Sequence, residues 1–164
     1  MGILTEDMKR VVREQKLGFV ATVCPDGTPN LSPKGTTAVW DDDHLVFANL
    51  RSPQTMENLR HNPAIEINVV DVIARKGYRF KGRATIVADG PLHDQLCQTA
   101  HGRGVDRFIK EFVLIKIERA GELVSPAYDT GQTEDQVRSD WLQYWIELNR
   151  PRLGAIVAKA AGDG

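Results

Sequence analysis

Two strand-like runs flank a tight turn near the N-terminus, and they restrict the fold more than any other feature of the chain. Residues 17–23 form a nearly continuous apolar run with β-branched side chains, and residues 29–40 have the pattern of a second strand. The turn between them, residues 24–27, has the sequence Cys-Pro-Asp-Gly, whose proline and glycine favour a reversal of the chain. We therefore expect a β-hairpin, which requires antiparallel strands.

The remainder of the chain continues with short strands and few helices. Strand patterns cover residues 44–49, 64–71, 78–88 and 112–118, and helix patterns cover residues 4–16, 52–61, 89–99 and 133–149. No Gly-x-Gly-x-x-Gly turn joins a strand to a helix, which disfavours a parallel dinucleotide-binding fold. The pattern predicts a mostly β fold, α+β by content, in which about six antiparallel strands form a barrel with peripheral helices.

The second strand is interrupted at Ser32-Pro33-Lys34-Gly35. Pro33 has no amide hydrogen for a strand ladder, and Gly35 permits a bulge. We expect this interruption to leave backbone groups that a ligand can reach.

A helix begins directly after the third strand. Ser52 is a good N-cap, and Pro53 suits the first helical position. The next three amides, 54–56, are therefore expected to point away from the helix start without partners. Together with the neighbouring Arg51, these donors predict an anion site, against the alternative of an ordinary capped helix.

The composition narrows the classes of function. A net charge of -1 over 164 residues argues against a protein that mainly coats nucleic acid or an anionic membrane. Cys24 and Cys97 form no Cys-x-x-Cys pair, and the histidines and acids lack metal-ligand spacing, so no metal site is predicted. The first residues lack a secretory pattern and no apolar run could span a bilayer, which indicates a cytoplasmic protein.

We expect one domain over residues 1–150, which includes the helix at 133–149, and a loosely held tail over residues 151–164. Within the helix, Trp141 and Trp145 lie one turn apart, a spacing typical of core or interface packing.

One strand has a basic face, because Arg79, Lys81 and Arg83 alternate along residues 78–88. They suit either a solvated strand face or a site for an anionic substrate. The aromatic residues of this strand lie on its opposite face, so they cannot build a stacking platform for nucleic acid with these cations.

Four segments occur in an order and spacing that resemble a known family. They are residues 18–29, with Asp-Gly-Thr-Pro at 26–29, Ser-Pro-Lys-Gly-Thr at 32–36, residues 45–63, and Tyr-Arg-Phe-Lys-Gly-Arg-Ala at 78–84. This ordered set resembles the pyridoxamine 5'-phosphate oxidase-like, FMN-binding split-barrel proteins over roughly residues 4 to 120. The resemblance implies a six-stranded split β-barrel and a homodimer with FMN at the subunit interface.

The resemblance also implies particular cofactor contacts. The FMN phosphate would lie at the turn after the third strand, against Arg51, Ser52, Gln54 and Thr55, with Asn58 orienting the site or touching the ribityl chain. The ring would lie along the second and third strands, against Pro33, Lys34, Gly35, Thr36, Ala48 and Asn49. Lys34 would stabilise negative charge on the reduced flavin, with an exposed solvent lysine as the alternative.

Two departures argue against a true pyridoxamine phosphate oxidase. In the family's phosphate turn an arginine-lysine pair follows the serine, whereas Pro53-Gln54 follows Ser52 here, and the helix at 133–149 replaces the C-terminal arginine signature. We predict an FMN-binding flavoprotein, an oxidoreductase that passes hydride or electrons between a small molecule or nicotinamide donor and FMN, without an assigned catalytic acid or base. The alternatives are a non-catalytic FMN carrier or sensor, or a relative that binds a deazaflavin or heme.

Overall fold

The structure is a computed structural model that describes residues 2–105 and 108–162. Within them the chain forms two compact units, one of residues 2–70 and 77–123 and one of residues 71–76 and 124–162. The helices are α1 (Glu6–Gln15), α2 (Pro53–His61), α3 (Gly90–His101) and α4 (Glu134–Gly162), with a short 3-10 helix at Pro126–Thr130. The strands are β1 (Gly18–Val23), β2 (Pro29–Lys34), β3 (Ala38–Val39), β4 (His44–Ala48), β5 (Ala64–Asp71), β6 (Lys76–Val87) and β7 (Phe112–Val124).

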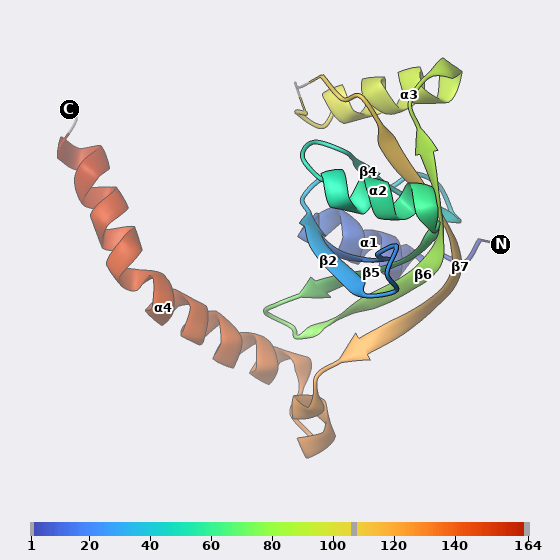
Figure 1. Ribbon diagram of the computed structural model, residues 1–164. Coiled ribbons are helices and arrows are strands. Elements are labelled where there is room, and N and C mark those ends of the chain that lie inside the picture. The colour runs from blue at the N-terminus through green and yellow to red at the C-terminus, as the bar shows by residue number, and fades with distance from the viewer. Residues whose placement is uncertain (1, 106–107, 163–164) are drawn as a thin grey trace. The chain divides into compact units, whose positions relative to one another are not determined.

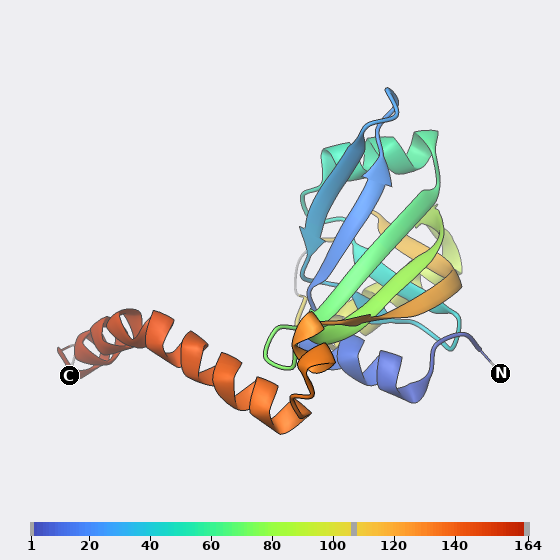
Figure 2. The ribbon, with the colours of Figure 1, turned by 90° about the horizontal axis from the view of Figure 1, so that it is seen from below.

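The seven strands of the described residues form one curled sheet in the order β2-β1-β5-β6-β7-β4-β3 (Figure 1). The expected hairpin is present, because β1 and β2 pair antiparallel with Phe19 opposite Pro33. The view in Figure 2 shows the strands winding around the interior of the unit. The split-barrel fold class is therefore confirmed, with seven strands in place of the predicted six.

The additional strand arises because the predicted strand at 29–40 breaks into two. Pro33 lies inside β2, at the edge of the sheet, where a missing amide donor is tolerated. The break falls slightly later than expected, at residues 35–37, after which β3 joins the opposite edge of the sheet beside β4. Residues 35–37 therefore connect the two edge strands.

The core lies on both sides of β4. Leu45 and Phe47 face the barrel interior, where they join the buried side chains of α1 and α2. Val46 and Ala48 face the other way and pack in a second cluster beneath α3, around Leu96. β4 is thus buried on both faces, which fixes the position of the chain that leads into α2.

The second unit consists of α4, the 3-10 helix and the turn at residues 71–76. Arg138 of α4 donates to Asp71 at 2.9 Å, and the guanidinium of Arg75 lies 4.3 Å from the ring centre of Trp141. Trp141 therefore stacks against Arg75 within this unit, whereas Trp145 is exposed, so core packing of the pair is not observed in the described residues. The helix begins at Glu134 and continues through Pro151 to Gly162, beyond the predicted end at residue 149.

Candidate flavin site

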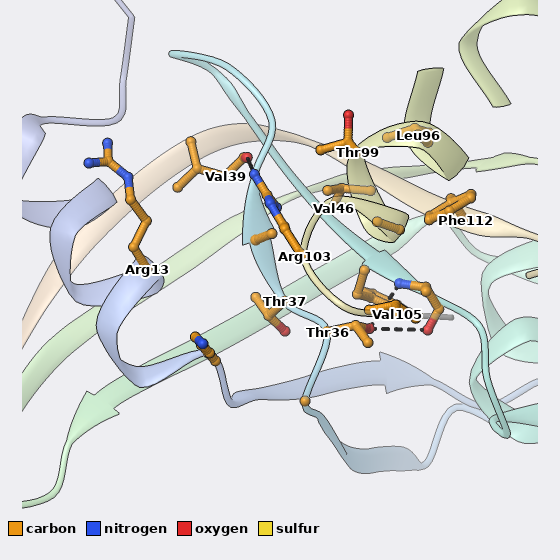
Figure 3. A pocket seen from close by; sticks show the side chains of 16 residues that line it. Arg13, Thr36, Thr37, Val39, Val46, Leu96, Thr99, Arg103, Val105 and Phe112 are labelled. Atoms are coloured by element: carbon orange, nitrogen blue, oxygen red, sulfur yellow. Dashed lines mark hydrogen bonds between the residues drawn. The ribbon is translucent and has the colours of Figure 1, made fainter. Parts of the chain in front are cut away.

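A cavity of about 390 Å³ lies beside the break between β2 and β3 (Figure 3). Gly35, Thr36 and Ala48 line it, so three of the predicted site residues meet at one place. Its volume is in the range of small-molecule sites. The remaining predicted residues do not line this cavity.

Thr36 fixes the break to β4. Its hydroxyl accepts from the amide of Ala48 at 3.0 Å and donates to the carbonyl of Ala48 at 3.3 Å. One side chain thereby replaces the strand ladder at this point, and it occupies both backbone groups of Ala48. Gly35 has open space around its Cα, so its backbone stays approachable.

The cavity also has a cationic rim that the sequence analysis did not identify. Arg13 and Lys16 come from the end of α1, and Arg103 follows α3. Arg103 reaches toward β3 in Figure 3, where its Nη2 donates to the carbonyl of Val39 at 3.4 Å. These cations come from helices far apart in the sequence, so no local motif could have revealed them.

The start of α2 offers the donors that the sequence predicted, with one correction. The amide of Met56 is wrongly predicted to be free, because it donates to the carbonyl of Ser52 at 3.1 Å. The amides of Gln54 and Thr55 have no acceptor among the described residues, and neither does the hydroxyl of Ser52, which makes no capping bond. Arg51 is exposed and has no ion pair in the described part of the chain. The helix start therefore presents unpaired donors beside a positive charge, a combination whose chemistry suits an anion.

Asn58 lies under this helix start, with none of its surface exposed. Its amide nitrogen donates to Thr22 at 3.0 Å, and its amide oxygen accepts from Gln54 at 2.9 Å. The bond to Thr22 attaches α2 to β1, and the bond from Gln54 lies within α2. Asn58 is thereby a residue that positions the helix start, and its amide is engaged within the protein.

Lys34 is buried without a carboxylate partner among the described residues. Only 4% of its surface is exposed, so the alternative of a solvent lysine is wrong. Its ammonium donates to the hydroxyl of Ser32 and lies 5.8 Å from the ring centre of Phe47. Burial lowers the pKa of Lys34, since a desolvated ammonium is unfavourable.

Asn49 holds the end of β4 in place. Its side-chain amide donates to the carboxylate of Glu111 at 3.0 Å, and its backbone amide donates to the carbonyl of Glu111, also at 3.0 Å. Burial of Glu111 opposes ionisation, but hydrogen bonds from Arg60 and Asn49 outweigh it and lower the pKa of Glu111. The carboxylate thus ties α2 to the chain segment that precedes it.

The basic strand face is partly neutralised. Arg79 and Lys81 both pair with Glu66, at 2.9 and 3.0 Å. Because these ion pairs are exposed, they favour the interpretation of the basic strand face as a solvated surface.

Comparison with known proteins identifies the family. The family model for pyridoxamine 5'-phosphate oxidase matches residues 4–121, and the chain belongs to this family. No curated protein matches the chain. Among solved structures, HupZ of Group A Streptococcus is 36% identical with a TM-score of 0.68, over 74% of this chain and 94% of that chain.

Two more distant structures share the fold. An FMN-binding protein of Syntrophomonas wolfei is 15% identical with a TM-score of 0.64, over 74% of this chain and 87% of that chain. An F420 reductase is 20% identical with a TM-score of 0.55, over 71% of this chain and 98% of that chain. α4 lies beyond the residues that the family model covers. No helix in the described ranges is long and apolar enough to cross a membrane.

Proposed function

We propose that the protein binds FMN and acts as an oxidoreductase. The observation that carries this proposal is the start of α2, where two amides, a hydroxyl and an arginine have no acceptor among the residues that the structure describes. A phosphate dianion needs such a set of donors, and the helix dipole favours negative charge at the same place. Bound FMN would supply the hydride or electron transfer, and the protein would supply binding, orientation and charge.

The residues of the chain fit the remainder of the cofactor. Gly35, Thr36 and Ala48 line a cavity next to the chain that leads to α2, and they would meet the ring. Lys34 is a buried cation without a carboxylate in the described structure, which suits a site that receives an anion. Its role would be to stabilise negative charge on the cofactor. Asn58 and Asn49 would hold the helix start and the end of β4 in position.

We also propose that two copies form a homodimer with FMN at their interface. The outer face of the β1–β2 hairpin exposes 41% of Phe19 and 67% of Leu31. Pro33 lies opposite Phe19 on the same hairpin, which extends this apolar face. A monomer in sedimentation experiments at micromolar concentration would contradict this assembly.

The substrate differs from that of a pyridoxamine phosphate oxidase in this proposal. The resemblance implies an arginine signature at the C-terminus of such an oxidase, and α4 stands in its place here. The turn proposed for the FMN phosphate differs as well, because Pro53 and Gln54 follow Ser52 and Arg51 is the cation that remains there. The F420 reductase with the same fold favours a deazaflavin as the second candidate cofactor. Absorption spectra of the loaded protein distinguish the two, because flavins and deazaflavins absorb at different wavelengths.

The phosphate assignment is tested by Ser52→Ala. The hydroxyl has no protein partner in the described structure, so this variant should fold normally. Loss of one donor to a charged acceptor should cost about 1–2 kcal/mol, which raises the dissociation constant of FMN about 5- to 30-fold. Ser139→Ala, on the exposed face of α4, is the matched control. An unchanged dissociation constant for Ser52→Ala would refute the assignment.

The rate at which donors reduce the bound flavin distinguishes an enzyme from a non-catalytic carrier. We expect NADH, NADPH or another screened donor to reduce the bound flavin faster than free FMN. Equal rates for every donor would favour a carrier or sensor.

A further inference from the structure

The long helix α4 has a half-exposed apolar face. Leu142 and Ile146 expose 50% and 47% of their surfaces, and their spacing of four residues places them on one side of the helix. The opposite side is occupied by an aromatic cluster within the second unit. There the ring of Tyr144 packs edge-on against Trp141 and Trp145, with ring centres 5.3 and 5.7 Å apart. The face of Leu142 and Ile146 is therefore the one that remains open for a partner.

The sequence of α4 extends this face over several turns. Positions 142, 146, 149, 153 and 156 carry Leu, Ile, Asn, Leu and Ile, and they follow each other at intervals of four and three residues. This alternation keeps residues on one stripe of a helix, and it is typical of helices that pair along their length. The pattern therefore indicates that the partner of α4 is another helix.

The other helices of the chain already have their apolar faces covered. α1, α2 and α3 bury Val12, Leu59 and Leu96 in the barrel unit, where these residues are 1%, 5% and 2% exposed. A helix whose apolar stripe lies in a core offers none to a second helix. Within the residues that the structure describes, the helix with a free stripe of this kind is α4 itself. A second copy of α4 is thus the partner that the chain supplies.

The charges of α4 determine the direction of such a pair. Residues 134–147 include four carboxylates and one arginine, whereas residues 148–162 include three cations and no carboxylate. In a parallel pair the acidic halves would face each other, as would the basic halves. In an antiparallel pair each acidic half faces a basic half, and the helix dipoles also oppose each other. Charge complementarity therefore favours the antiparallel arrangement.

We propose that α4 is an interaction surface for a second copy of this chain, in which two α4 helices pair antiparallel through the face of Leu142 and Ile146. α4 lies beyond residues 4–121, which the family model covers, so this contact is additional to the interface proposed for the barrel. The pairing requires neither FMN nor the β1–β2 hairpin.

The antiparallel pair makes a specific proximity that one chain cannot produce. When position 142 of one copy lies beside position 153 of the other, Lys159 is level with Glu134 and Asp135 of the other copy. Within one chain these residues are at opposite ends of the same helix, because the segment from 135 to 159 is about 36 Å long. A direct link between Lys159 and Glu134 or Asp135 therefore joins two copies.

The experiment treats the full-length protein with a carbodiimide, which couples a carboxylate directly to an amine. The covalent dimer is isolated by its mass and its linked peptides are identified by mass spectrometry. We expect Lys159 to be linked to Glu134 or Asp135. In Leu142→Ser/Ile146→Ser the yield of this link should fall at least about 10-fold, because the pair loses its apolar contact.

The matched control is Tyr144→Ser/Leu148→Ser. These residues have the same spacing and expose 50% and 51% of their surfaces, but they lie on the other side of α4, so the yield should persist. A wild-type covalent dimer without the link would overturn the proposal. Links from Lys159 to the barrel of its own chain in place of this link would also overturn it, since α4 would then cover its own barrel. Equal yields in the two double variants would refute the assigned face. If the link forms and FMN does not bind, the pairing stands and the proposed cofactor falls.

Discussion

Replacing Lys34 by methionine is expected to stabilise the cofactor-free protein and to weaken its affinity for FMN. In the described structure the ammonium has the Ser32 hydroxyl and the Phe47 ring as its neighbours, with 4% of the residue exposed and no carboxylate within reach. Replacing even a paired buried charge with apolar side chains of similar size is often neutral or stabilising by about 1–4 kcal/mol, and Lys34 has no carboxylate to offset its desolvation. Because the Ser32 bond offsets part of the cost, we expect a gain of about 1–3 kcal/mol in the free energy of unfolding.

The pH dependence gives this prediction a second observable. Burial lowers the pKa of Lys34 below its ordinary value of 10.5, so the unfolded chain holds this proton more tightly than the folded protein. The stability contributed by this residue therefore rises with pH between its folded pKa and 10.5. The advantage of Lys34→Met should be greatest near neutral pH and shrink as the pH approaches 10.5.

Urea unfolding without cofactor measures the first effect, and FMN titration measures the second. Loss of the proposed interaction between the Lys34 ammonium and the cofactor should raise the dissociation constant about 10- to 100-fold. The control is Lys116→Met, an exposed lysine on β7, which should change neither quantity. The reasoning is refuted if Lys34→Met destabilises the cofactor-free protein and leaves FMN affinity intact.

Two further predictions concern the barrel itself. Gly82→Ala should destabilise the protein by about 3 kcal/mol or more in thermal unfolding, because a Cβ there would meet a β7 carbonyl oxygen at 2.0 Å. Gly121→Ala, with open space around it, should have little effect, and equal losses would contradict this reasoning. Glu111→Gln should lower stability at pH 7 by about 1–2 kcal/mol, since the lowered pKa of Glu111 stabilises the fold above its ordinary value of 4.5. That difference should shrink as the pH falls below 4.5 toward the lowered pKa of Glu111, and a difference that stays constant on acidification would exclude the ionised carboxylate as its cause.

The local features of the chain were predictable from the sequence. Thr5 caps α1 by accepting from the amide of Met8, and the Cys-Pro-Asp-Gly turn joins β1 and β2 in the predicted hairpin. The cap and the turn each depend on a few adjacent residues, so local residue propensities are enough to predict them. The break near Pro33 was also predicted, although it falls after Lys34 because an edge strand tolerates proline.

The candidate site was predictable only in part, because it depends on packing between distant segments. The free donors at the start of α2 followed from Ser52 and Pro53, but the burial of Asn58 depends on Thr22 of β1. The cationic rim combines Arg13 with Arg103, which lie on different helices, and no pattern along the chain brings them together. The burial of Lys34 likewise requires the barrel to close around it.

The central claim is that the start of α2 holds the phosphate of FMN. Isothermal titration of the cofactor-free protein with FMN and with riboflavin, which lacks the phosphate, tests it most directly. Because several donors and the charge of Arg51 act on the phosphate, we expect riboflavin to bind at least about 100-fold more weakly than FMN. Equal affinity for the two, or no binding of FMN, would contradict the claim.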